Sequence, residues 1–300
     1  MENKKYKIIT DGSCDLPKEL MEEKGVIVVP FYVSFDGENY LKEVVEMGVR
    51  EFYDKMVEEP NTFPKSSLPS VQDYADVFMP LAAENTAIIC ICITTKFSGS
   101  MQSALSAKEL VQENYPNAEI TVIDATVNTV LQGLLVLEAV SMQEKEVPYE
   151  QVIAKIEEIK STGRIFFTVG NMEYLKHGGR IGKLTGLAGS VLGIKPLITL
   201  KEGEIFPSGI TRSRKKSMEK ILELLDEYLK EFQVDMQEYS ITIGYCYDYE
   251  EAVEFRKKLV KFMEERNQTV GEIPIYRIGA VIGVHTGPHA LGIGILKRYL

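Results

Sequence analysis

Residues 94–100 (Thr-Thr-Lys-Phe-Ser-Gly-Ser) place small hydroxyl side chains and a glycine directly after the apolar run 87–94. The apolar run is typical of a strand buried on both faces, and a helix is predicted from about residue 100 to 114. Ser98 and Gly99 then lie at a helix N-terminus, where free backbone N–H groups and hydroxyl groups can hold an anionic oxygen. Ser98 could also act only as a helix cap, and the sequence leaves both interpretations open.

A nucleophile, a base and an orienting acid can be selected from the same sequence. Ser98, His285 and Asp124 are the residue types of a serine hydrolase triad. The flanks of Ser98 do not form the motif G-x-S-x-G, because Lys96 and Ser100 stand where the motif requires glycine. A serine-type acyl hydrolase is therefore kept as an alternative.

Two histidines have the spacing of a metal site. His285 and His289 are four residues apart, as in zinc-binding helices. Pro288 lies between them, however, and the sequence offers no third ligand nearby. We therefore expect no metal ion.

The glycine-rich segment 178–183 (Gly-Gly-Arg-Ile-Gly-Lys) resembles a phosphate-binding loop only superficially. His177 stands where that motif requires its first glycine, and Leu184 stands where it requires Ser or Thr. No G-x-G-x-x-G sequence opens the first predicted helix either. We therefore expect no nucleotide cofactor and no kinase or dehydrogenase activity in this chain alone. Arg180 could be an exposed cation offered to a carboxylate or phosphate, or a solvated side chain in a tight turn.

The elements that position these residues alternate in the first half of the chain. Strands are predicted at 6–10, 87–94 and 119–123, and helices at 16–24, 49–58, 72–84, 100–114, 130–145 and 150–161. This alternation favours a doubly wound, mostly parallel α/β lobe. Residues 26–35 predict a further strand, followed by a hairpin turn at Asp36-Gly37.

The second half has a different pattern. It predicts strands at 164–169, 239–246 and 273–280, a hairpin over 197–207, and helices at 213–232 and 249–266. We therefore expect an α+β second lobe with a mixed sheet, and a ligand site between the lobes. The boundary is placed near residue 160, which gives domains 1–160 and 161–300, and the hairpin at 26–40 could pack on the second lobe.

Composition excludes several classes of partner. The chain has 44 acidic and 34 basic residues and a net charge of −10, which opposes binding to nucleic acid and to anionic membrane surfaces. No apolar run approaches the roughly 20 residues that span a bilayer, and the first residues lack the apolar core of a signal peptide. Cys14, Cys90, Cys92 and Cys246 are interpreted as packed, reduced thiols. We expect a cytoplasmic protein without integral membrane contact.

Five segments, in their order along the chain, resemble the motifs of the DegV family, the fatty-acid-binding subunits of bacterial fatty acid kinase. They are Thr10-Asp11-Gly12-Ser13-Cys14-Asp15-Leu16, Ser66-Ser67-Leu68-Pro69-Ser70, Thr94-Thr95-Lys96-Phe97-Ser98-Gly99-Ser100-Met101-Gln102-Ser103-Ala104, Tyr174-Leu175-Lys176-His177-Gly178-Gly179-Arg180-Ile181 and His285-Thr286-Gly287-Pro288-His289. Val122-Ile123-Asp124 and Gly193-Ile194-Lys195-Pro196 are also similar. Each motif is weak alone, but their joint order over residues 10–294 is specific.

The resemblance implies a ligand site. Ser98 is expected to bind the carboxylate of a fatty acid, Ser66 to assist in the place of the usual Thr, and His285 to close the site. Further candidates for this site are Ser67, Thr95, Gly99 and Arg180. The chain departs from the family pattern at Leu68, where Gln is usual, and at His289, where Gly is usual. The replacement of this glycine by His289 is expected to affect the backbone of the loop and hence the direction in which His285 points.

The resemblance also implies a function. The chain would hold one long-chain fatty acid and present it to a separate ATP-dependent fatty acid kinase, which forms acyl phosphate for phospholipid metabolism. Arg180 is expected to be exposed near the mouth of the site and to be used by the kinase. The chain itself would then not be an enzyme. Two alternatives stay open: a serine-type acyl hydrolase using Ser98 and His285, and a fatty acid sensor without a kinase partner.

Overall fold

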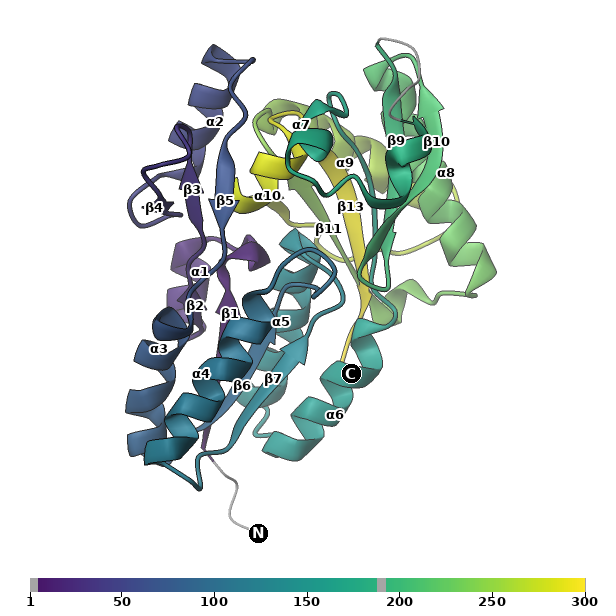
Figure 1. The fold of residues 1–300 in the computed structure, drawn as a ribbon. Coiled ribbons are helices and arrows are strands. Elements are labelled where there is room, and N and C mark those ends of the chain that lie inside the picture. Colours follow the sequence, from purple (N-terminus) through teal and green to yellow (C-terminus); the bar gives the residue numbers. More distant parts are fainter. Residues whose placement is uncertain (1–4, 188–192, 300) are drawn as a thin grey trace.

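A computed structural model describes residues 5–187 and 193–299. Two separate sheets dominate the molecule, one from the N-terminal half and one from the C-terminal half, and helices pack around both (Figure 1). A third, small sheet lies beside them. The expected α/β fold with one parallel and one mixed sheet is confirmed.

The first sheet is parallel throughout. Its strand order is β2 (Ile27–Val29), β1 (Tyr6–Asp11), β6 (Ala87–Cys92) and β7 (Ile120–Asp124). The helices of this half are α1 (Lys18–Glu23), α3 (Val71–Ala83), α4 (Ser100–Asn114), α5 (Thr129–Glu144) and α6 (Tyr149–Lys160). Every residue of β6 is buried, as its uninterrupted apolar sequence predicts, because helices cover both faces of the sheet.

The two faces of β6 belong to different parts of the core. Cys90 and Cys92 lie on the face that packs against α3 and α4, whereas Ile89 and Ile91 lie on the face that packs against α5. All four cysteines of the chain are buried and free. Because parallel strands end at one common edge, the segments that follow β1, β6 and β7 emerge together there.

The second sheet is mixed. Its order is β10 (Glu204–Thr211), β9 (Lys195–Lys201), β8 (Arg164–Thr168), β13 (Leu291–Lys297), β11 (Tyr239–Tyr245) and β12 (Ile275–Arg277), with only the β11–β12 pair parallel. The helices of this half are α7 (Glu173–His177), α8 (Arg214–Glu231), α9 (Tyr249–Glu264) and α10 (Ala280–Thr286). Short 3-10 helices occur at Gly12–Cys14, Gly182–Leu187 and Met236–Glu238. Strand β13 was not predicted.

The third sheet is antiparallel and has the order β4 (Leu41–Lys42), β3 (Tyr32–Ser34), β5 (Lys65–Ser67); helix α2 (Val49–Glu58) follows β4. The prediction of one strand over 26–35 was wrong. Pro30 has no N–H to donate and stands between β2, which joins the parallel sheet, and β3, which does not. The predicted turn at Asp36-Gly37 does connect two antiparallel strands, and Gly37 adopts φ of +78°. Strands β3 and β5 contact α10 from the C-terminal half.

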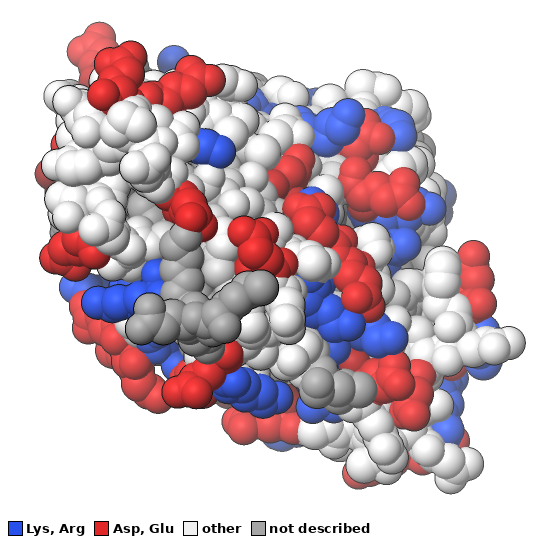
Figure 2. All heavy atoms as spheres, turned by 90° about the horizontal axis from the view of Figure 1, so that it is seen from below, with Lys and Arg blue, Asp and Glu red and all other residues white. Residues whose placement is uncertain are grey.

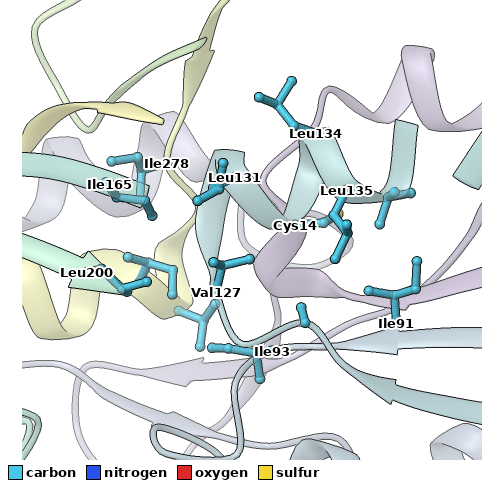
Figure 3. Packing of buried hydrophobic residues seen from close by; sticks show 14 of the residues in the cluster. Cys14, Ile91, Ile93, Val127, Leu131, Leu134, Leu135, Ile165, Leu200 and Ile278 are labelled. Carbon is cyan, nitrogen blue, oxygen red and sulfur yellow. The ribbon is translucent and has the colours of Figure 1, made fainter. Parts of the chain in front are cut away.

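One apolar cluster extends through both halves. Figure 3 shows Ile93 and Val127 from the first half close to Ile165, Leu200 and Ile278 from the second. This shared core contains residues from both sides of residue 160. The division into two domains at that residue stays a prediction.

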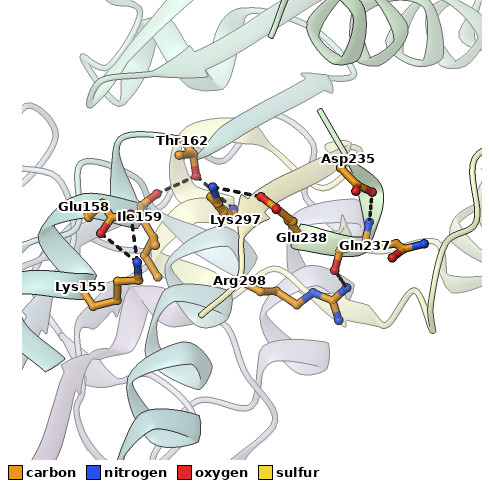
Figure 4. Close-up of polar contacts among 9 residues, drawn as sticks. All are labelled: Lys155, Glu158, Ile159, Thr162, Asp235, Gln237, Glu238, Lys297 and Arg298. Carbon is orange, nitrogen blue, oxygen red and sulfur yellow. Dashed lines mark hydrogen bonds and ion pairs between the residues drawn. The ribbon is translucent and has the colours of Figure 1, made fainter. Parts of the chain in front are cut away.

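The segment that joins the two halves is held by the C-terminal strand. Thr162, between α6 and β8, donates from Oγ1 to the carbonyl of Ile159 at 2.7 Å and accepts the N–H of Lys297 at 3.1 Å (Figure 4). Lys297 also pairs with Glu238 at 3.1 Å. These contacts fix the connection between the halves.

The molecular surface carries charges of both signs. Figure 2 shows acidic side chains interspersed with basic ones over the face seen from below, without a continuous basic area. Within the described part of the chain, no helix is both long and apolar enough to cross a membrane.

Candidate functional site

A chamber of about 210 Å³ lies where the two halves and the small sheet meet. Its polar lining consists of Ser66, Ser67, Ser98, Asn128, Arg180, His285 and Thr286, and its apolar lining of Phe31, Leu68, Ile93, Phe97, Leu175, Ile205, Val281 and Ile282. The chamber therefore combines a cluster of hydrogen-bonding groups with apolar walls, the combination that suits an amphipathic ligand. We refer to it below as the chamber.

Ser98 reaches the chamber from the segment between β6 and α4. Its Oγ accepts the N–H of Ser100 at 3.2 Å, so it satisfies one of the free donors at the start of α4. Its hydroxyl proton has no acceptor within the described residues. The helix-cap interpretation and the ligand interpretation of Ser98 are therefore compatible, because the cap uses the oxygen and leaves the proton free to donate.

Ser66 and His285 form a pair across the chamber. Ser66 lies on β5, and its Oγ is 3.3 Å from His285 Nε2. His285 Nδ1 is buried against Gly178 and makes no hydrogen bond of full geometry in the described chain. When Nε2 carries the proton, it donates to Ser66, and the Ser66 hydroxyl proton is then free to donate to a ligand.

The expectation of a loop at residues 285–289 was wrong for its first two residues. His285 and Thr286 form the last turn of α10, and the chain turns only at Gly287, which adopts φ of +76°. His289 is exposed and lines a different cavity from the chamber. Its replacement of the usual glycine therefore leaves His285 on a regular helix.

Burial and a neighbouring cation keep His285 uncharged. Burial first, and the positive charge of Arg180 second, lower the pKa of His285 from 6.5 to about 4, against the smaller opposing effect of the Gly178 backbone. At neutral pH the ring is therefore a neutral donor and acceptor. The positive charge at the mouth of the chamber comes from Arg180.

Arg180 is exposed at the mouth of the chamber and is held by backbone carbonyls. Its Nε and Nη2 donate to the carbonyl of Phe97 at 3.1 and 3.0 Å, and Nη1 donates to Gly178 at 2.9 Å. These bonds fix the guanidinium beside the residue that precedes Ser98. Arg180 thus serves both to hold the Ser98 segment and to place a cation at the mouth.

Two of the predicted site residues lie outside the chamber. Thr95 and Gly99 line an adjacent open groove, which shares Phe97, Ser98, Arg180 and Ile205 with the chamber. The Thr95 hydroxyl donates to Asp124 Oδ2 at 2.6 Å. The five other candidates, Ser66, Ser67, Ser98, Arg180 and His285, line the chamber together.

A serine hydrolase triad is not assembled in the described residues. Asp124 accepts hydrogen bonds from Thr95 and from the N–H of Thr126, at 2.7 Å for the latter, and makes none with His285. His285 in turn contacts Ser66 and not Ser98. The described residues also contain no group of three or more side chains placed to hold a metal ion.

Sequence reasoning missed Asn128, which precedes α5 and lines the chamber. It also lines a second, mostly apolar cavity of about 40 Å³, whose walls include Val130, Ile165, Phe167 and Leu291. The position of Asn128 after the last strand of a parallel sheet could have indicated it, because ligands bind at that edge.

The whole chain matches known proteins. A model of a family described as "Uncharacterised protein, DegV family" matches residues 5–298. The chain belongs to the DegV family. A DegV domain-containing protein of Clostridium perfringens is 31% identical over 292 residues, which cover 97% of this chain and 99% of that protein.

Two solved structures have the same fold. One from Eubacterium ventriosum, described as a stearic-acid-binding protein, is 43% identical with a TM-score of 0.93, over 98% of this chain and 99% of its own. Another, described as a fatty-acid-binding DegV family protein from Thermus thermophilus, is 30% identical with a TM-score of 0.86, over 98% and 99% of the two chains. The family resemblance expected from the sequence motifs is confirmed.

Proposed function

We propose that this protein binds one long-chain fatty acid, with the carboxylate at Ser98, Ser66 and His285 and the tail in the apolar part of the molecule. The observation that carries the proposal is the chamber itself, because its free hydroxyl protons and neutral imidazole adjoin apolar walls. The fatty acids named for the proteins from E. ventriosum and T. thermophilus support the same ligand class.

The energetics favour a ligand of this kind. Each hydrogen bond from a hydroxyl or imidazole to a carboxylate contributes roughly 1.5–3 kcal/mol before desolvation is counted. Burial of a tail contributes about 0.8 kcal/mol per methylene. A long tail therefore supplies most of the affinity, and the polar cluster fixes which end of the ligand lies at the chamber.

The proposed role of the bound fatty acid is that of a substrate for another protein. The sequence has no phosphate-binding loop, so a separate ATP-dependent fatty acid kinase would transfer the phosphoryl group to the carboxylate in the cytoplasm. Arg180, exposed at the mouth, is the residue we assign to contact with that kinase. The chain alone then acts as a carrier and not as an enzyme.

The test is direct. The protein is expressed in bacteria, its intact mass is measured under native conditions, and bound lipid is extracted and identified. We expect about one long-chain fatty acid per chain. Preparations that contain no acyl lipid and that take up neither added oleate nor added palmitate would contradict the proposal.

A further inference from the structure

An unpaired carboxamide lines the chamber. Asn128 is the residue before helix α5, a position where Asn usually accepts an N–H of the first helical turn. Its side chain makes no such bond, and no other hydrogen bond to it occurs within residues 5–187 and 193–299. Asn128 is partly buried. Its carboxamide is therefore a free donor and acceptor, and only its backbone carbonyl bonds within the helix, to the N–H of Gln132 at 3.2 Å.

The position of Asn128 separates it from the carboxylate seat. The chamber and the smaller apolar cavity share three lining residues, Asn128, Ile282 and Thr286, which we call the neck. Ser66, Ser98, Arg180 and His285 line the chamber and not the smaller apolar cavity. A tail that left the carboxylate seat toward the smaller cavity would therefore pass Asn128.

The neck also contains a second polar group with spare capacity. The Thr286 hydroxyl donates to the carbonyl of Ile282 at 3.1 Å, so its proton is used. Its oxygen lies 3.9 Å from the Cys246 thiol, a weak donor, and keeps a further lone pair that can accept. Asn128 can both donate and accept. A hydroxyl group on a ligand has one proton to donate and lone pairs that can accept. It can therefore donate to the Thr286 oxygen and accept from the Asn128 amide.

A plain hydrocarbon tail fits the neck poorly. Methylenes that pass Asn128 remove water from the carboxamide and return no hydrogen bond, which is unfavourable for a polar group. A site built to hydrogen-bond a ligand hydroxyl discriminates strongly against the analogue that lacks it, because its own polar groups stay unpaired. The polar neck in an otherwise apolar path is thus a specificity element.

We infer that Asn128 and Thr286 form a second polar subsite that binds a hydroxyl group in the interior of the acyl chain, so that the favoured ligands are in-chain hydroxylated long-chain fatty acids. This inference rests on the proposed function and names its substrate class. The carboxylate stays at Ser98 and Ser66, and the hydroxyl occupies the neck.

The experiment compares ligands on delipidated wild-type protein. Stearic acid and a series of hydroxystearic acids, with the hydroxyl at successive positions along the chain, are titrated by calorimetry. We expect at least one positional isomer to bind tenfold or more tightly than stearic acid. If no isomer exceeds stearic acid, the inference is overturned while fatty acid binding stands. If neither stearic acid nor any isomer binds, the proposed function itself fails.

A variant identifies the residue responsible. Asn128→Leu keeps the approximate size and removes the polar group, so it should abolish the preference for the hydroxy acid over stearic acid. Thr286→Val should reduce the preference to a smaller extent. Equal weakening of both ligands in Asn128→Leu would instead assign Asn128 to the carboxylate seat and overturn the inference. Asn128→Ala provides the same comparison where the leucine variant fails to fold, and the wild-type series depends on no variant.

Discussion

Ser66 Oγ and His285 Nε2 lie 3.3 Å apart although 219 positions separate them in the sequence. The contact joins the small sheet, through β5, to helix α10 of the C-terminal half. Ser98 reaches the same chamber from the end of the parallel sheet. The carboxylate seat is therefore completed only when three separately built parts of the fold meet.

The first prediction concerns the charge of His285. Its pKa is lowered to about 4 by burial and by Arg180, so the folded protein disfavours the protonated ring. Its contribution to stability is fully present above pH 6.5 and is lost as the pH falls toward 4. NMR titration of ligand-free protein should show His285 neutral down to about pH 5, while exposed His177 serves as the control ring. Titration of His285 near pH 6.5 would contradict the assignment.

The second prediction separates the two roles of Ser98. Ser98→Ala removes the hydroxyl that caps Ser100 and the proton that we assign to the ligand, so fatty acid affinity should fall about tenfold, equivalent to roughly 1.4 kcal/mol. Ser98→Thr keeps the hydroxyl and should retain most of the affinity. Calorimetry with palmitic acid measures both variants. Unchanged affinity in Ser98→Ala would leave Ser98 as a helix cap alone.

The third prediction concerns Arg180. Arg180→Glu should leave fatty acid binding within a few-fold of wild type but suppress acyl-phosphate formation in a mixture with a fatty acid kinase and ATP. Lys176→Glu is the matched control, since Lys176 is also exposed and, among the described residues, pairs only with Glu173 at 2.7 Å. Equal loss of binding and of acyl phosphate in Arg180→Glu would mean that its bonds to Phe97 hold the chamber itself.

The sequence predicted the parallel half of the fold better than the mixed half, for a physical reason. The apolar run of β6 and the periodic sequence of α4 are local signals, and α4 spans the predicted residues 100–114. Strand β13 carries Gly292 and Gly294 between its aliphatic residues, and glycine weakens a strand pattern. Its place in the sheet depends on pairing with β8 and β11.

The site residues divide in the same way, into those with a local sequence signal and those that depend on long-range contacts. Ser98 was identifiable because it follows a buried strand and precedes a helix, a local arrangement with known chemistry. No local sequence pattern indicates the contact of Ser66 with His285. The two residues were assigned to one site only because of the family resemblance. Asn128 was missed because nothing in its own segment shows that it leaves α5 uncapped.

The fourth prediction is that stability depends on Glu43. Its Oε1 accepts the N–H groups of Ala280 and Val281 at the start of α10, while Oε2 is buried without a partner in the described residues. Burial, and to a lesser extent the charge of Asp11, raise its pKa to about 7 against the opposing effect of those two N–H groups. The pKa of nearby buried Asp15 is also raised, by burial first and by Glu43 second.

A carboxyl whose pKa is raised binds its proton more tightly in the folded state than in the unfolded state. The free energy of unfolding should therefore fall as the pH rises from about 4.5 to 7, by about 3 kcal/mol for Glu43. Glu43→Gln keeps the acceptor oxygen and removes the charge, so urea unfolding should show a shallower pH dependence. Exposed Glu46→Gln is the control. Identical pH dependence in wild type and Glu43→Gln would refute the prediction.

The last prediction distinguishes a carrier from a hydrolase. A serine nucleophile needs a base within about 3 Å, whereas the imidazole of the chamber contacts Ser66 and not Ser98. Asp124 is bound to Thr95 and cannot orient His285 in this arrangement. Fluorophosphonate probes should therefore leave Ser98 unlabelled in lipid-free and lipid-loaded protein, and the chain alone should hydrolyse neither acyl esters nor ATP. Stoichiometric labelling of Ser98 that is lost in His285→Ala would establish the hydrolase instead, because only an activated serine reacts in that way.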